Sequence, residues 1–159
     1  MIGDPVKYKN DGTVEVATAG DASCGVFMGC FYTDPDTSKP TFRRHFPASL
    51  SPGDAIAFVA DDPDHLFVCQ QDSDLQVYPL QTLENANLVF GSGSTTTGLS
   101  GVEIDSSSAT TTATLQVRIV AGYETPSNTI STAAAGNNSV FVVKINNHQL
   151  GSSTGTAGV

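Results

Sequence analysis

The chain has 159 residues, of which 14% are charged, and its formal net charge is −9. This length suits one domain, and the acidic charge disfavours nucleic acid and anionic membranes as partners. No stretch approaches the roughly 20 apolar residues of a membrane span, and the first residues lack the basic and apolar regions of a signal peptide.

Short runs rich in β-branched and aromatic residues follow one another along the chain, separated by Gly, Pro, Asp and Asn. A spacing of about 8–12 residues between turn signals is typical of a β-sandwich or barrel. Asn10-Asp11-Gly12 is a strong hairpin signal between the first two runs. The strands expected in chain order are residues 6–8, 13–17, 24–33, 41–46, 55–60, 66–70, 75–78, 102–104, 110–120 and 140–146.

The long expected strand at residues 24–33 places Cys24, Val26, Met28 and Cys30 on one face and two phenylalanines on the other. Two glycines beside these phenylalanines indicate a bulge or a close backbone approach. Six residues of strand would separate the two cysteines by about 20 Å, which is too far for a disulfide. We therefore expect both to be small buried hydrophobic residues in a reducing cytoplasm.

The segments between the strands are expected to be irregular. Residues 80–88 fit one or two helical turns or a covered loop, and residues 91–98 fit a flexible polar loop. Asp105 precedes three serines and is a candidate cap for a single helical turn. The sequence therefore predicts an all-β fold: a single compact β-barrel or β-sandwich of short antiparallel strands, with long polar loops and little helix.

The end of the chain has a different composition. Residues 151–159 contain almost no large side chain. We expect them to form a flexible tail, or an arm ordered only by a neighbour, after a single β domain at residues 1–150.

Residues that serve in catalysis or metal binding are present but follow no known motif. Residues 61–65 and 34–36 hold acidic side chains around a proline, without the pattern of a calcium loop, so they predict turns, with Ca²⁺ as the alternative. His65 and Cys69 leave a zinc site conceivable, although the three histidines have no ligand spacing. No catalytic residue, metal or cofactor is expected; a small hydrolase with paired carboxylates is the enzymatic alternative.

Three sets of stretches carry a resemblance to a known group of proteins. They are residues 3–7 with 11–14 and 19–21, residues 25–32 with 46–49 and 59–63, and residues 93–98 with 143–149. Together they resemble small virion structural proteins of tailed phages, especially phages of marine bacteria, that are similar to capsid decoration or cement proteins. Their order, and the Val-Lys-Ile-Asn-Asn-His run at residues 143–148, are the more specific features.

The resemblance implies a non-enzymatic protein that binds the outer surface of the major capsid protein shell and stabilises the head. It further implies self-association, with a homotrimer favoured by analogy, and synthesis in the bacterial host cytoplasm. The alternatives are a tail, neck or fibre component of the virion, or a carbohydrate-binding or adhesive β module. For the last of these, Phe42, Phe46 and Tyr123 are the candidate exposed aromatic residues.

Extended segments are expected to make the contacts with the partner. The candidate partner-binding residues are Val6 and Tyr8 near the N-terminus, Pro35 and Pro40 around the proline-bounded turn, and Leu150 before the tail. All three segments are expected to be extended, and two of them lie at chain ends.

Overall fold

The computed structural model describes residues 1–72, 83–127, 130 and 138–158, and within them the fold is all-β. None of the helical segments in these residues has the length and hydropathy needed to cross a membrane. The strands are β1 (Pro5–Tyr8), β2 (Val14–Val16), β3 (Gly25–Thr33), β4 (Pro40–Arg43), β5 (Ala55–Ala60), β6 (Leu66–Gln70), β7 (Asn85–Ala86), β8 (Leu88–Ser94), β9 (Leu99–Ile104), β10 (Val117–Gly122) and β11 (Val140–Ile145), with two short 3-10 turns, η1 (Pro52–Asp54) and η2 (Ser106–Ser108).

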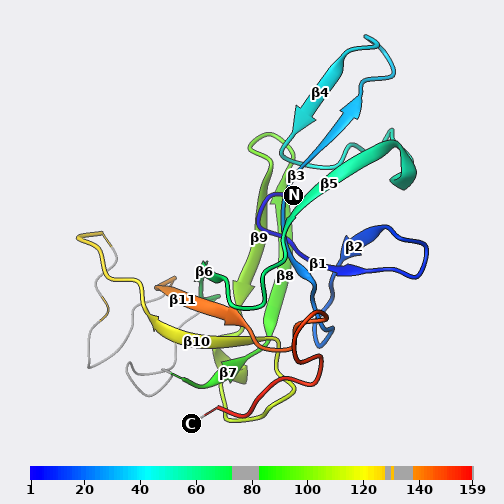
Figure 1. Ribbon diagram of the computed structural model, residues 1–159. Helices are drawn as coiled ribbons and strands as arrows, with labels where there is room; N and C mark the ends of the chain where they lie inside the picture. The colour runs from blue at the N-terminus through cyan, green and yellow to red at the C-terminus, as the bar shows by residue number, and fades with distance from the viewer. Residues whose placement is uncertain (73–82, 128–129, 131–137, 159) are drawn as a thin grey trace.

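These strands form three antiparallel sheets (Figure 1). A five-stranded sheet has the order β2-β1-β3-β4, with β5 paired to the opposite edge of β3. A four-stranded sheet has the order β6-β11-β10-β7, and β8 with β9 makes a separate hairpin. The sheets stay open and pack in a sandwich-like arrangement, so of the two expected architectures the sandwich is the one adopted and the closed barrel is not.

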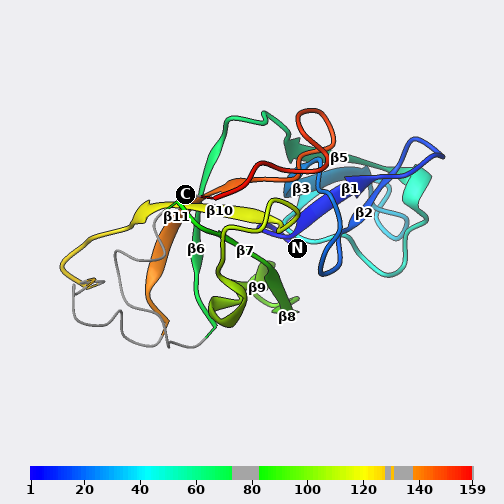
Figure 2. The ribbon, with the colours of Figure 1, turned by 90° about the horizontal axis from the view of Figure 1, so that it is seen from below.

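Two hydrophobic clusters lie in different parts of the molecule. The first, which we call the sandwich core, lies between the four-stranded sheet and the β8–β9 hairpin; it comprises Ala86, Leu88, Ile104, Val117, Ile119, Ile130, Phe141 and Val143. The second lies on the five-stranded sheet and comprises Val6, Cys24, Phe27, Cys30 and Tyr32. Seen from below, β1, β2 and β5 lie on one side of the molecule, and β6, β10 and β11 lie on the other (Figure 2). The two clusters therefore belong to two different halves.

The bulge indicated by the glycines of β3 is confirmed. The pairing of β3 with β5 shifts between Phe27 and Gly29. After the inserted residue, each side chain points to the face opposite to the one that simple alternation would give it. Phe27 and Cys30 are therefore both buried, whereas Met28 and Phe31 are exposed. The expected grouping of Met28 with the cysteines is therefore wrong, because simple alternation does not continue through a bulge.

Several strand boundaries agree with the sequence. The expected ranges of β5 and β6 are confirmed, and β11 ends one residue earlier than expected. Asp105 caps η2 by accepting a hydrogen bond from the Ser107 N–H. In contrast, β4 ends at Arg43, and residues 110–116 precede β10 without belonging to it. The strand expected at residues 75–78 lies outside the described residues.

The glycine- and serine-rich segment at residues 91–98 is not a loop throughout. It continues β8 to Ser94, and only residues 95–98 form the turn to β9. A Cβ atom on Gly91 would lie 2.5 Å from the carbonyl oxygen of Gly101 on the paired strand, so this hairpin needs glycine for a close backbone approach. In the neighbouring segment, residues 80–82 lie outside the described residues. Asn85 and Ala86 form β7 and Leu88 begins β8, and residues 83–88 contain no helical turn.

The C-terminal segment lies against the chain's own body. The carbonyl oxygen of Thr156 accepts hydrogen bonds from Asn85 Nδ2 at 2.8 Å and from Arg118 Nη2 at 2.7 Å. The Thr156 N–H donates to Asn146 Oδ1 at 3.0 Å. Contacts within the chain therefore reach as far as Gly158, whose N–H donates to the Thr111 oxygen at 3.0 Å. The expected flexible tail or arm stays a prediction.

Candidate interaction surface

An exposed apolar patch lies on the outer face of the five-stranded sheet, on β3, β4 and β5. Phe31 on β3 has Phe42 on β4 and Ile56 on β5 as its cross-strand neighbours. The ring centroids of Phe42 and Phe58 lie 6.0 Å apart, at an interplanar angle of 50°. We call Phe31, Phe42, Ile56 and Phe58 the aromatic patch; each is between 41% and 65% exposed. Clusters of this kind mark surfaces at which proteins bind one another.

The bulge in β3 builds this patch. The inserted residue turns Phe31 outward, into the row that contains Phe42 and Ile56. Gly29 has a φ of +127°, and a Cβ atom there would lie 2.4 Å from Phe42 Cζ. Because glycine has no side chain, the Phe42 ring can lie against the sheet, next to Phe58, which is the cross-strand neighbour of Gly29.

The inner face of the same sheet encloses a concavity of about 760 Å³. β2 lines it with Val14 and Val16, and β5 lines it with Ala57 and Val59, while the buried Phe27 also contributes to its wall. A volume of this size is in the range of small-molecule pockets. The described residues contain no group of three His, Cys, Asp or Glu side chains placed to hold a metal ion.

Cysteine chemistry in the concavity is disfavoured. Cys30 lines it, but its Sγ is buried and donates to the backbone oxygen of His45 at 3.5 Å. Burial raises the pKa of the Cys30 thiol, and burial also raises the pKa of Cys24 to about 11 and of Cys69 to about 12. A thiol that stays protonated is a poor nucleophile, so packing is the role that the structure supports for all three; the burial expected for Cys24 and Cys30 is confirmed.

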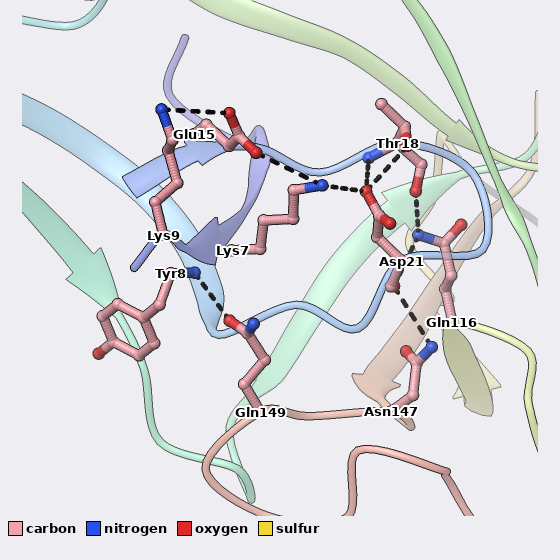
Figure 3. Close-up of polar contacts among 9 residues, drawn as sticks. All are labelled: Lys7, Tyr8, Lys9, Glu15, Thr18, Asp21, Gln116, Asn147 and Gln149. Carbon is pink, nitrogen blue, oxygen red and sulfur yellow. Dashed lines mark hydrogen bonds and ion pairs between the residues drawn. The ribbon is translucent and has the colours of Figure 1, made fainter. Parts of the chain in front are cut away.

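A network of polar side chains joins the five-stranded sheet to the other half of the molecule (Figure 3). The carboxylate of Asp21 accepts hydrogen bonds from Lys7 Nζ at 2.8 Å and from the N–H and hydroxyl of Thr18 at 2.9 and 2.8 Å. Lys7 first, and then the Thr18 hydrogen bonds, lower the pKa of Asp21 to about 2. The same hydrogen bond raises the pKa of Lys7. These contacts fix the turn between β2 and β3 on the edge of the sheet.

Two amide side chains connect this turn to the sandwich. Gln116 Nε2 donates to the backbone oxygens of Thr18 and Asp21 at 3.0 and 3.3 Å, and Gln116 Oε1 accepts from the Leu88 N–H at 3.1 Å. Asn147 Nδ2 also donates to the Asp21 oxygen, at 3.3 Å. Both amides are buried. We call Lys7, Thr18, Asp21, Gln116 and Asn147 the polar clasp; it makes direct contacts between the two halves.

The β1–β2 hairpin lies next to the polar clasp, and one hydrogen bond to another segment and two ion pairs within the hairpin stabilise it there. The Tyr8 N–H donates to Gln149 Oε1 at 2.8 Å, while the Tyr8 ring points away from the network (Figure 3). Glu15 on β2 is 3.5 Å from Lys7 Nζ and 3.9 Å from Lys9 Nζ. The structure thus brings together residues 19–21 and 143–149, two of the stretches that carry the resemblance to phage proteins.

The five predicted partner-binding residues fall into separate places. Val6 is only 3% exposed and belongs to the hydrophobic cluster on the five-stranded sheet, so its expected role as a direct contact is corrected to core packing. Tyr8 and Leu150 are exposed, and the bond from Tyr8 to Gln149 places them near each other. Pro35 and Pro40 are exposed in the β3–β4 hairpin, which projects from the body (Figure 1).

Most of the aromatic patch was not predicted from the sequence. Phe42 was a candidate exposed aromatic residue, but Phe31, Ile56 and Phe58 were not. The sequence does contain a signal that two of them share one face of a strand, because Ile56 and Phe58 alternate with alanines. Alternation places them on one face but does not say that this face stays uncovered.

The acidic clusters act as turn formers, as predicted. The Asp34 carboxylate accepts hydrogen bonds from the N–H groups of Asp36 and Thr37, both at 3.0 Å. The Asp62 carboxylate accepts one from the Asp64 N–H at 2.8 Å. These are the local bonds by which Asp stabilises turns, and they lower the pKa of Asp34.

His148 is buried and not solvated. Its Nδ1 accepts a hydrogen bond from the Leu150 N–H at 3.1 Å, and its backbone bridges to Ser23 beside the polar clasp. Burial lowers the pKa of the imidazole, against smaller opposing effects of Asp61 and Asp62. The ring is therefore neutral at pH 7.

No known protein family, curated protein or solved structure matches this chain. The exposed apolar surfaces of the five-stranded sheet are therefore the features from which a function follows.

Proposed function

We propose that this protein is a non-enzymatic decoration or cement protein of a phage head, which binds the outer surface of the major capsid protein shell and stabilises the particle. It would be made in the cytoplasm of the bacterial host and reside on the outer capsid surface. The resemblance of its sequence stretches to phage virion proteins supports this. The observation that carries the proposal is a sheet with apolar residues uncovered on both faces.

The size of the aromatic patch indicates what kind of binding to expect. A large aromatic side chain offers about 150–250 Å² of surface. At the exposures observed, the patch offers on the order of 300–400 Å², less than the roughly 800 Å² that each partner buries in a standard interface. A single contact of this size binds weakly, but several linked copies that engage the same lattice together bind tightly. A repeating shell provides that lattice.

The charge distribution also suits the outside of a shell. A net charge of −9 does not compete for the packaged nucleic acid. Arg43 and Arg44 follow Phe42 directly and are exposed, and neither has an ion pair among the described residues. A partner surface with carboxylates beside an apolar area would complement this edge of the patch.

The proposal is tested on purified heads, by comparing the wild-type protein with Phe42→Ser and with Val68→Ser as a matched control. Phe42 and Val68 are both 55% exposed, but Val68 lies on β6, in the other sheet. We expect the wild type and Val68→Ser to remain on intact heads at a stoichiometry comparable to the shell protein, and Phe42→Ser to lose most of its occupancy. Absence of the wild type from heads, or equal occupancy of the two variants, would contradict the proposal.

Two other functions predict different results when phage particles or the isolated protein are tested. A tail, neck or fibre component would separate with tails when heads and tails are fractionated. A carbohydrate-binding module is favoured by the exposed phenyl rings, since aromatic faces stack on sugars. The 50° tilt between Phe42 and Phe58 gives no flat platform, however. Binding of the isolated protein to an array of bacterial surface glycans, lost in Phe42→Ser, would support that module instead.

A further inference from the structure

β5 has a free edge with no feature that would prevent another strand from pairing with it. Among the described residues it pairs with β3 alone. Its sequence is Ala-Ile-Ala-Phe-Val-Ala, six residues without charge or proline. An apolar edge strand of this length presents unpaired backbone N–H and C=O groups to any strand that fits.

Most other edges of the described sheets carry features that hinder pairing; the exception, β8, is uncharged and pairs only with β9, but it contains two glycines, which weaken a strand. β2 has Glu15 at its centre, and β4 begins at Pro40 and ends at Arg43. β6 is uncharged, but the next residue, Gln71, bridges to Ile104 of β9 and so covers one end. Charge, proline and covering are the usual protections of an edge strand. The best match for β5 in this molecule is therefore β5 of a second copy.

We propose that two copies of this chain pair antiparallel along β5, about a two-fold axis through Ala57, to form one sheet that continues across both molecules. With the axis perpendicular to the sheet, facing residues share a side. Ile56 of one copy then faces Phe58 of the other, and the two aromatic patches join. A register shifted by one residue would instead set Asp54 against Asp61, which like charge disfavours.

The two-fold pair has a distinct dependence on salt. The paired strands are uncharged, whereas each copy carries a net charge of −9. Long-range repulsion between the copies weakens as salt screens it, so association should strengthen at higher ionic strength. The pair differs from the trimer that the phage resemblance implies. It does not rest on the proposed function, because it concerns the isolated protein.

Sedimentation equilibrium of the isolated protein over a range of concentrations tests the pairing. We expect a reversible monomer–dimer equilibrium. Ile56→Lys, on the exposed face of β5, should raise the dissociation constant by about tenfold or more, as the loss of about 1.4 kcal/mol would. Val68→Lys places the same charge on the uncharged edge strand β6 and should leave the dissociation constant unchanged. Because both side chains are exposed, we expect the circular dichroism spectra of the two variants to match that of the wild type.

Cysteine cross-linking tests the register. Facing residues of antiparallel strands have Cα atoms about 4.5–5.5 Å apart, within the roughly 4.4–6.8 Å of a disulfide. Ala57→Cys should therefore form a disulfide-linked dimer on mild oxidation, and Ile56→Cys, which faces residue 58, should form far less, with the wild type as background. A monomer at every concentration, a trimer unaffected by Ile56→Lys, or equal cross-linking at positions 56 and 57 would overturn the inference. None of these outcomes bears on the head-binding result for Phe42→Ser.

Discussion

Replacing Asp21 with Asn removes the charge at the centre of the polar clasp while keeping the shape of the side chain. Lys7 and Thr18 lower the pKa of Asp21 from 3.8 to about 2. Taken in full, this shift corresponds to about 2 kcal/mol of folding free energy, at 1.36 kcal/mol per pKa unit. Because the side chain is 30% exposed, water screens the interaction, and we expect Asp21→Asn to lower the free energy of unfolding at pH 7 by about 1 kcal/mol.

The pH dependence distinguishes this electrostatic cause from a general loss of packing. The pKa of Asp21 in the folded protein lies below its ordinary value, so the ionised form favours folding. That contribution is complete above pH ~4 and is lost as the pH falls through about 2. Urea unfolding of the wild type and of Asp21→Asn should therefore differ at pH 7 and converge as the pH is lowered. A difference that stays constant down to the lowest pH at which both proteins fold would refute the reasoning.

A double-mutant cycle assigns the effect to one pair. Lys7 Nζ donates to Asp21, whereas Lys9 contacts Asp11 and Glu15 instead. We expect Asp21→Asn and Lys7→Met to show a coupling energy of about 0.5–1 kcal/mol. The matched cycle with Lys9→Met should be additive. Equal coupling in both cycles would mean that the net charge, and not the specific contact, is responsible.

Three further substitutions probe the clasp, the bulge and the buried imidazole. Gln116→Leu leaves buried backbone groups without partners and should lower the free energy of unfolding in urea by roughly 2–4 kcal/mol; a loss below about 1 kcal/mol would mean that the clasp does not join the two halves. Gly29→Ala should lower the Tm far more than Gly12→Ala, because both glycines have positive φ but only the Cβ at position 29 would meet Phe42; equal losses would contradict the close approach. Because burial lowers the pKa of His148 from 6.5, its contribution to stability is present above that pH and lost below it. The Tm should therefore fall between pH 7 and pH 5 more steeply in the wild type than in His148→Gln, and parallel profiles would exclude this histidine as the cause.

The parts of the fold that follow from short-range signals were predictable. The six apolar residues of β5 specify a strand without reference to anything else. The cap at Asp105 requires only the next two residues. The strand that continues through Gly91 was not predictable in this way, because its reason is the approach of Gly101 from the partner strand. A glycine- and serine-rich run indicates a loop until that partner is known.

The interaction surface was less predictable because it depends on contacts distant in the sequence. The bonds from Gln116 to Thr18 and from Asn147 to Asp21 join residues 98 and 126 positions apart. Nothing in the sequence near either amide indicates that it links the two halves. The sequence predicted Gln116 only as part of a strand. Val6 and Tyr8 show the same limit: both lie on β1 two positions apart, yet one is buried and the other exposed. Only the arrangement of the neighbouring elements decides which one can reach a partner.

The division of the molecule into two halves explains how it can fold with so much apolar surface uncovered. The sandwich core is enclosed by the four-stranded sheet and the β8–β9 hairpin, so the second half need not bury all of its own apolar residues. The polar clasp holds that half in place by hydrogen bonds, which specify geometry more strictly than apolar contacts do. Substitutions in the aromatic patch should therefore change assembly with little effect on stability, whereas substitutions in the clasp should change both. Patch variants that assemble normally but unfold more easily would show that the patch belongs to the core of this half.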